Sequence, residues 1–279
     1  MYDEKKIVVC VSGGKDSSAM CLNLMEKGYS PSDYVRVFSD TGWEDQGTYE
    51  YLDYLEKTVG PIIRLTAEIS VPPERMEMVQ RIEAMLGFES PMVRRIYKNY
   101  HIPTTLGKWC TRDLKMTPTK KFLDNIEEAE PVILVGIRKQ ESLRRQKMTE
   151  WEYSDFYDCD VHRPLLDWTE KDVIDIHQRF QLIPNNLYLT GWNRVGCYPC
   201  IHARKKELLL LSDKRVEVIE QIEKDLGKYF FRIKNLEDRG IKSVMTWAKT
   251  ARGGQQFELF NTEPQTCVKW GLCDFSGGE

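Results

Sequence analysis

Short β-branched runs alternate with longer helical patterns through the first half of the chain. The apolar runs at residues 5–11 and 34–40 predict two buried strands. Between them, a mostly apolar segment with helical spacing ends at Gly28, where a glycine typically ends a helix. A strand, a helix and a second strand in this order form a βαβ unit, and its strands run parallel.

The same alternation continues further along the chain. It predicts two more strands, at residues 61–67 and 131–137, and helices near residues 46–58, 73–86 and 116–128. Alternating strands and helices are typical of an α/β fold with a doubly wound parallel sheet. We therefore predict this fold for the first part of the chain.

The pattern changes after about residue 160. Thr169-Glu170-Lys171-Asp172 is similar to a capping box and predicts a helix that runs to about Phe180. A loop rich in Asn, Gly and Pro follows, and then a leucine-rich helix that starts near Lys205. We predict one α/β domain over residues 1–200 and a smaller helical extension over residues 201–279.

The composition is typical of a globular protein and does not indicate a particular binding partner. Of the 279 residues, 41% are hydrophobic and 30% are charged, which is typical of a soluble globular protein. The net charge of −3 does not indicate nucleic-acid binding, although a local basic patch can occur on an acidic protein. The start, MYDEKKIVVC, predicts a buried strand and not a signal peptide, and no apolar stretch is long enough to span a bilayer. We expect a cytoplasmic protein.

The segment VVCVSGGKDSSAM predicts a phosphate-binding loop. Gly13 and Gly14 let the backbone approach an anion, and the helix that follows presents free N–H groups to it. Ser12 and Ser17 add hydroxyl donors. Asp16 cannot bind a phosphate directly, so it holds the loop or binds a Mg²⁺ ion that bridges to the phosphate.

The position of this loop favours ligand binding over an ordinary glycine-rich turn. It lies at the carboxyl end of the first strand, where open α/β sheets bind ligands, and serines flank the glycine pair. The spacing differs from the GxxxxGK[ST] loop of the usual P-loop NTPases.

Cysteines provide a second candidate site. Cys10 and Cys21 lie inside apolar patterns and are expected to be buried. Cys197-Tyr198-Pro199-Cys200 is a CxxC motif, which by itself fits a redox pair, half a zinc site or half an iron–sulfur site. The redox pair is disfavoured because the motif does not begin a thioredoxin-like helix.

SGGKDS resembles the signature of the ATP pyrophosphatase and PAPS reductase superfamily, whose fold is adenine nucleotide alpha hydrolase-like. Three further segments resemble motifs of the same superfamily, and together they cover roughly residues 5–200. They are Phe38-Ser39-Asp40-Thr41-Gly42 on the adenosine side, Val135-Gly136-Ile137-Arg138 at a later strand end, and the RPLLDWTEKDV stretch at residues 163–173.

The resemblance implies ATP and Mg²⁺ as cofactors and assigns two groups of residues. The nucleotide would be bound by Ser12, Gly13, Gly14, Asp16, Ser17, Ser39, Asp40, Thr41, Gly136 and Arg138. The catalytic residues would be Lys15, Asp16, Arg112 and Lys115. Arg112 and Lys115 are expected to face the nucleotide or the transferred group, since both are suited to phosphate recognition.

The stretch around Trp109-Cys110 resembles the Cys-Cys-x-x-Arg-Lys motif of the reductases, whose cysteines bind a [4Fe–4S] cluster with a later CxxC. Trp109 occupies the first cysteine position, so one ligand of that scheme is missing. The resemblance suggests Cys110, Cys197, Cys200 and Cys273 as ligands, with Cys267 in reserve. Four thiolates also suit zinc, which is the alternative.

The function implied is cleavage of ATP to AMP and pyrophosphate, activating an oxygen that sulfur then replaces. The chain looks similar to the cluster-bearing enzymes of bacterial DNA phosphorothioation, the Dnd and Ssp systems. The expected partners are a nucleic acid and a sulfur donor such as a cysteine desulfurase. DNA is favoured over tRNA, and partner proteins would bring the nucleic acid to the enzyme. The alternatives are a PAPS or APS reductase, a tRNA-thiolating enzyme, and a nucleotide-binding subunit without turnover. The reductase is disfavoured because its Glu-Cys-Gly-Leu-His segment has no match at Gly271-Leu272-Cys273-Asp274.

Overall fold

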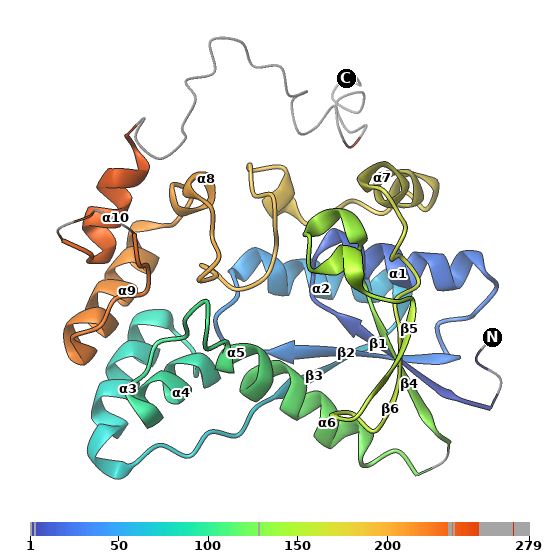
Figure 1. Ribbon diagram of the computed structural model, residues 1–279, viewed down its shortest axis with the longest axis horizontal. Helices are drawn as coiled ribbons and strands as arrows, with labels where there is room; N and C mark the ends of the chain where they lie inside the picture. The colour runs from blue at the N-terminus through green and yellow to red at the C-terminus, as the bar shows by residue number, and fades with distance from the viewer. Residues whose placement is uncertain are drawn as a thin grey trace.

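The computed structural model describes residues 2, 4–127, 129–233, 236, 238–250 and 270. At its centre is a six-stranded sheet with the order β3-β2-β1-β4-β6-β5 (Figure 1). Every neighbouring pair is parallel except β5 and β6. The strands are β1 (Lys6–Val11), β2 (Tyr34–Asp40), β3 (Ile62–Thr66), β4 (Pro131–Val135), β5 (Trp151–Ser154) and β6 (Cys159–His162).

The chain runs outward from β1 to β3 and then crosses to the other side of β1 to form β4. The direction of winding therefore reverses between β1 and β4. In open α/β sheets, ligands bind outside the carboxyl ends of the strands at such a switch point. The loops after β1 and β4 are consequently the expected walls of a site.

Helices cover the sheet and extend beyond it. The longer ones are α1 (Lys15–Glu26), α2 (Gln46–Val59), α3 (Pro73–Leu86), α4 (Pro91–Asn99), α6 (Thr117–Leu123), α7 (Glu170–Arg179), α9 (Asp213–Leu226) and α10 (Ile241–Ala248). The short ones are α5 (Trp109–Thr111), the π-helix η1 (Arg112–Met116), the 3₁₀ turns η2 (Lys139–Glu141), η3 (Arg145–Lys147) and η4 (Asn186–Tyr188), and α8 (Lys205–Leu208).

Two apolar cores sandwich the sheet. On one face, α1, α2 and α7 pack on the strands through residues such as Leu22, Leu52 and Val173. On the other face, α6 packs on β4 and β6 through Leu123 and Ile133. Because both faces are covered, β1 after Lys6 and all of β4 consist of apolar residues and do not alternate with polar ones.

A third core joins the helices that follow β3 to the helices near the C-terminus. It contains Ile82 of α3, Ile96 of α4, Ile219 of α9 and Val244 of α10. In Figure 1 these four helices lie together beside the carboxyl ends of β2 and β3. The smaller C-terminal part is therefore mainly helical, as predicted.

The structure confirms the predicted α/β class and most of the predicted elements. The helix over 73–86 and the strand over 34–40 have the predicted bounds. The helix predicted near 116–128 is shorter, because a π-helical turn precedes it and it ends at Leu123. The helix predicted near Lys205 is a single turn; the long helix begins at Asp213, where the Ser212 side chain caps the amide of Arg215. The sequence analysis missed β5, β6, α4 and α10.

No helix in the described part of the chain is long and apolar enough to cross a membrane.

A buried histidine makes stability depend on pH. His177 in α7 is 1% exposed, and its Nδ1 is 2.7 Å from the carbonyl oxygen of Val173. Burial lowers the pKa of His177 to about 4 from 6.5, Lys15 acts in the same direction, and the Val173 carbonyl and Asp16 oppose the shift. The unfolded chain therefore binds one more proton than the folded chain between about pH 6.5 and pH 4.

We predict that His177 reduces the free energy of unfolding as the pH falls through this window, by up to about 3 kcal/mol. The His177→Gln variant should lose that part of the pH dependence. Urea unfolding of both proteins at several pH values between 7 and 4.5 measures the difference. Parallel stability curves for the two proteins would contradict the prediction.

Candidate functional site

The loop between β1 and α1 has a backbone that only glycine can adopt. Gly13 has φ of +71°, and a Cβ atom there would lie 2.8 Å from Cγ2 of Thr48. Gly14 is the N-cap of α1 and has no side chain to cap the helix. The amides of the first turn are therefore directed into the loop, where an anion can accept from them.

The loop after β4 packs closely on the first turn of α1. A Cβ atom at Gly136 would lie 2.9 Å from the carbonyl carbon and oxygen of Asp16 and 3.0 Å from the amide nitrogen of Ser17. A glycine at this position lets the carboxyl end of β4 approach the helix N-terminus. The structure thus brings together two of the predicted nucleotide-binding segments.

The two serines of the loop are hydrogen-bonded to each other. Their hydroxyl oxygens are 3.2 Å apart, and the Ser17 hydroxyl donates to the carbonyl of Gly14 at 2.9 Å. Ser12 is exposed and Ser17 is buried. The Ser17 hydroxyl therefore shapes the loop, while the Ser12 hydroxyl is accessible to a ligand.

Two cations are held beside the loop by carboxylates. The Lys15 ammonium lies 3.3 Å from Glu170 and 4.7 Å from the centre of the Tyr188 ring. Arg138, only 5% exposed, donates from Nε to Asp16. The contact with Arg138 is consistent with the loop-holding role considered for Asp16.

Two residues that support the loop were missed in the sequence analysis. The Tyr188 hydroxyl accepts a hydrogen bond from the Lys15 amide at 3.1 Å. The Asn185 side chain, which is fully buried, donates to the carbonyl of Gly13 at 3.1 Å. The only sequence signal was the polar turn Pro184-Asn185-Asn186, which does not reveal a contact with residues near the start of the chain.

The predicted adenosine-side residues are engaged in internal hydrogen bonds at the end of β2. The Ser39 hydroxyl lies 3.2 Å from the carbonyl oxygen of Lys115. Asp40 accepts hydrogen bonds from the Gly42 amide and the Tyr49 hydroxyl, both at 2.8 Å. Thr41 is fully buried and donates to Glu44 at 2.8 Å. This segment therefore forms a rigid turn beside the phosphate loop.

Glu44 is a buried carboxylate that the sequence analysis did not single out. Its side chain is 1% exposed and accepts hydrogen bonds from the Thr41 hydroxyl and from the amides of Thr41 and Trp43. The Lys115 ammonium lies 3.8 Å from it. Glu44 also forms an isolated β-bridge with Cys197. Glu44 therefore connects three parts of the chain: its carboxylate joins the turn after β2 to the π-helix η1, and its backbone pairs with the CxxC loop.

Lys115 and Arg112 point into different surroundings. The pKa of Lys115 is raised. The sulfur of Cys197 makes the largest contribution, and Glu44, Cys110 and Cys200 add to it, while burial acts in the opposite direction. Arg112 is instead 68% exposed and pairs with Asp113 at 3.0 Å. Of these two predicted catalytic cations, only Lys115 lies among the candidate site residues.

Three of the four proposed ligand cysteines lie around Lys115. Burial raises the pKa of Cys197 to about 12; Lys115 opposes this, and Glu44, Cys200 and Cys110 add to it. Burial also raises the pKa of Cys110, and Cys200 adds to that shift. Residues far apart in sequence are thus brought together as the motifs suggested.

These cysteines do not form a complete ligand set. Within the residues that the structure describes, no three His, Cys, Asp or Glu side chains are placed to hold one metal ion. Cys267 and Cys273 lie outside the described residues. The grouping of three thiols around a cation is compatible with a metal or cluster site, but the described geometry does not assign one.

Comparisons with known proteins identify one family model and several similar proteins. The family model of the phosphoadenosine phosphosulfate reductase domain matches residues 6–203. An uncharacterized 37.8 kDa protein of Escherichia phage 186 is 33% identical, over 96% of this chain and 96% of that protein. The adenosine 5'-phosphosulfate reductase of Burkholderia cepacia is 30% identical over 47% of this chain.

The matches differ in how much of each relative they cover. The chain spans 55% of the Burkholderia enzyme and about half of two longer relatives from Methanocaldococcus jannaschii, 42% of one and 51% of the other. Among solved structures, a PAPS reductase from Candida auris in a phosphate complex is similar, with a TM-score of 0.49, 14% identity, and coverage of 69% of this chain and 81% of that one.

We predict that Gly136→Ala disrupts the site. The added methyl group would overlap the backbone of Asp16, and overpacking of this kind costs about 1–3 kcal/mol. Nucleotide affinity should fall together with the free energy of unfolding. Isothermal titration with ATP and urea unfolding measure the two effects.

Gly196→Ala is the matched control, because a Cβ atom there would have no neighbour within 4 Å. Equal nucleotide affinity in the Gly136→Ala variant and in the wild type would show that close packing at Gly136 is not needed for the site.

Proposed function

The chain belongs to the phosphoadenosine phosphosulfate reductase domain family, and on this basis we propose that it is an ATP pyrophosphatase that activates a nucleic-acid group for sulfur incorporation. The observation that carries the proposal is the Ser12–Ser17 loop. Its glycine backbone and the N-terminus of α1 lie at the switch point of the sheet. Such a loop suits the pyrophosphate that leaves when ATP is cleaved next to its α-phosphate.

The reaction requires positioning and charge stabilisation more than covalent chemistry. An oxygen of the acceptor bonds to the α-phosphorus, the bond between the α- and β-phosphates breaks, and pyrophosphate leaves. A sulfur nucleophile then bonds to the activated acceptor atom, and AMP leaves with the oxygen. Negative charge develops on the phosphates, and fixed cations and amides stabilise it most effectively.

The residues beside the loop are suited to this role. Lys15 and Arg138 are buried cations held by Glu170 and Asp16, so their positions are set before the nucleotide arrives. A Mg²⁺ ion bound through Asp16 would neutralise further charge on the leaving group. In this proposal Lys115 faces the transferred group from the opposite side, beside Glu44.

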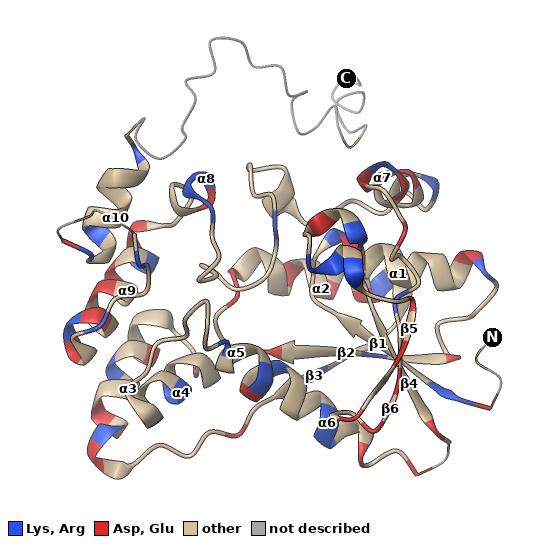
Figure 2. Cartoon of the chain, in the orientation of Figure 1, with Lys and Arg blue, Asp and Glu red and all other residues tan. Residues whose placement is uncertain are grey.

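We favour a DNA backbone phosphate as the acceptor, as in DNA phosphorothioation, with tRNA as the alternative. The support is the set of motifs shared with that class of enzyme and the basic segment after β4, which carries Arg144, Arg145 and Lys147. Several stretches of this segment are blue in Figure 2. Partner proteins would select the acceptor, and a cysteine desulfurase would supply the sulfur.

Reduction of APS or PAPS is the second candidate. It is favoured by the match to the Burkholderia adenosine 5'-phosphosulfate reductase. It is disfavoured because Gly271-Leu272-Cys273-Asp274 does not reproduce the segment that carries the nucleophilic cysteine in the reductases.

A [4Fe–4S] cluster, or zinc in its place, would be bound by Cys110, Cys197, Cys200 and Cys273. Three of these thiols surround Lys115, and its positive charge would offset the negative charge of metal-bound thiolates. We assign no chemical step to this group.

We predict that Asp16→Ala lowers the rate of pyrophosphate release from ATP by about a hundredfold, a typical loss for one group that positions or stabilises transition-state charge. Because the substitution also leaves the buried Arg138 without its carboxylate, circular dichroism and urea unfolding check that the variant is folded under the assay conditions. A coupled pyrophosphate assay with and without DNA measures the rate.

Asp53→Ala is the control, since Asp53 is exposed on α2 and contacts only Arg64 among its described ion pairs. Sulfite release from APS in place of pyrophosphate release from ATP would favour the reductase. No turnover of either substrate, with DNA and partner proteins present, would favour a nucleotide-binding subunit.

We predict that Cys197→Ser removes the iron from anaerobically purified protein and bleaches its brown colour. Metal analysis and an absorbance spectrum report both. Cys21→Ala is the control, because Cys21 is buried in α1, within the core on the α1 face of the sheet. Iron content that survives the Cys197 substitution would show that the ligand set is wrong, and zinc in place of iron would support the alternative.

A further inference from the structure

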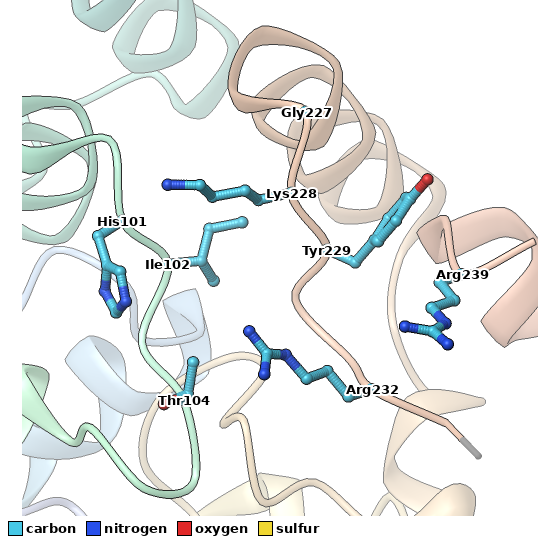
Figure 3. Close-up of a pocket in the computed structure, with 8 residues that line it drawn as sticks. All are labelled: His101, Ile102, Thr104, Gly227, Lys228, Tyr229, Arg232 and Arg239. Carbon is cyan, nitrogen blue, oxygen red and sulfur yellow. The ribbon is translucent and has the colours of Figure 1, made fainter.

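A basic cavity lies apart from the phosphate loop, between the segment at residues 101–104 and the chain after α9. Its volume is about 280 Å³. In Figure 3, Lys228 and Arg232 extend towards the 101–104 segment, while Tyr229 lies on the side of Arg239. The full lining is His101, Ile102, Thr104, Gly227, Lys228, Tyr229, Arg232 and Arg239.

The cavity has basic side chains and no acidic one among the residues that line it. His101, Lys228, Arg232 and Arg239 are all exposed. Lys228 donates to the carbonyl of Tyr100, while neither arginine forms an ion pair with any residue in the described ranges. The two guanidinium groups are therefore available to an anion from solution.

Three carboxylates that the structure describes near the cavity in sequence are engaged elsewhere. Asp225 pairs with Arg81 at 2.7 Å. Glu223 accepts hydrogen bonds from the amides of Phe230 and Ile241. Asp238 accepts from the Gly240 amide at 3.0 Å and from the Ser243 hydroxyl. None of these three carboxylates forms an ion pair with the cations that line the cavity.

An exposed aromatic ring accompanies these cations. The side chain of Tyr229 is 45% exposed, although its neighbours Phe230 and Phe231 are buried. An aromatic face beside arginine and lysine is the combination that binds single-stranded nucleic acid, since the ring stacks on a base and the cations contact phosphates. The volume is slightly below the roughly 300–1,000 Å³ of pockets that enclose small molecules, which favours one part of a long ligand.

Further positive charge connects this cavity with the candidate active site. His101 accepts a hydrogen bond from the indole of Trp109, which directly precedes Cys110. The pKa of His202 is lowered by burial, then by the nearby charges of Lys108 and Arg194. Arg194 in turn lies near Arg145. Lys108, Arg194 and Arg145 are thus cations near the CxxC loop and the loop after β4.

We propose that the cavity formed by Lys228, Tyr229, Arg232 and Arg239 binds an unpaired stretch of the nucleic acid whose activation is proposed above, with the cations on its phosphates and Tyr229 against a base. This inference rests on the proposed function for the identity of the acceptor. It assigns strand binding to the helical C-terminal part and not to the nucleotide-binding loop.

The test measures strand binding and nucleotide cleavage separately. Fluorescence anisotropy follows binding of a labelled single-stranded DNA, the RNA of the same sequence and the DNA duplex, without ATP and over a range of salt concentrations. The variants are Arg232→Gln/Arg239→Gln and Tyr229→Ala. The control is Lys57→Gln/Lys121→Gln, which removes equal charge from exposed positions on α2 and α6.

The arginine double variant should bind single strands at least tenfold more weakly, and its log–log salt slope should fall by about 1.4, the value for two lost phosphate contacts on a single strand. Tyr229→Ala should weaken binding on the order of tenfold without changing the slope. Three outcomes would each overturn the inference. The double variant could bind as tightly as the wild type, or the wild type could bind no single strand. The third outcome is equal binding of the duplex together with no effect of Tyr229→Ala.

Pyrophosphate release without nucleic acid distinguishes this inference from the proposed function. The cavity variants should cleave ATP at the wild-type rate under these conditions. Cavity-dependent strand binding by a protein that does not cleave ATP would refute the proposed activity and leave the cavity assignment standing. ATP cleavage without strand binding would refute the cavity assignment and leave the proposed activity standing.

Discussion

The buried carboxylate of Glu44 is the interaction on which the site depends most. It accepts hydrogen bonds from the turn after β2 and contacts the ammonium of Lys115, while the backbone of Glu44 forms a β-bridge with Cys197 in the CxxC loop. Arg215 of α9 donates to its carbonyl oxygen at 3.4 Å. Removing one partner from such a buried group leaves an uncompensated charge, which is far more costly than losing a surface contact. Four parts of the chain therefore hold their relative positions through one residue.

The other cations of the site are also paired with carboxylates. Carboxylates hold cations at the edge of the sheet before any ligand binds, as Glu170 does for Lys15 and Asp16 does for Arg138. Preorganised charges of this kind need little rearrangement when a phosphate arrives. The helix N-terminus adds a positive dipole end without adding a side chain. The cations, the helix dipole and the glycine backbone therefore all lie next to the carboxyl end of β1, where a phosphate would bind.

The sequence predicted those features that local patterns determine. β2 and α3 follow from contiguous apolar periodicity, and the loop at Gly13 and Gly14 follows from residues adjacent in sequence. The strands β5 and β6 are short and form a hairpin; β5 is mostly exposed at the sheet edge, and in the buried β6 the polar residues Asp160 and His162 interrupt the hydrophobic pattern. Glu44, Asn185 and Tyr188 were missed because their roles depend on contacts with distant parts of the chain. For Arg112 the motif gave a position in the sequence but not its surroundings, which in the structure are solvent and Asp113.

The link between the end of β2 and the CxxC loop has a consequence for how the protein forms during synthesis. Trp43 accepts a backbone hydrogen bond from Tyr198 and donates its indole N–H to the carbonyl of Pro199, across more than half of the chain. Contacts between such distant residues form only after the ribosome has produced both of them. β1, β2 and β3 can pair early, but the indole of Trp43 lacks its partner until residue 199 has emerged. During that interval the growing chain exposes an apolar edge at the future site, and a chaperone has a defined surface to protect.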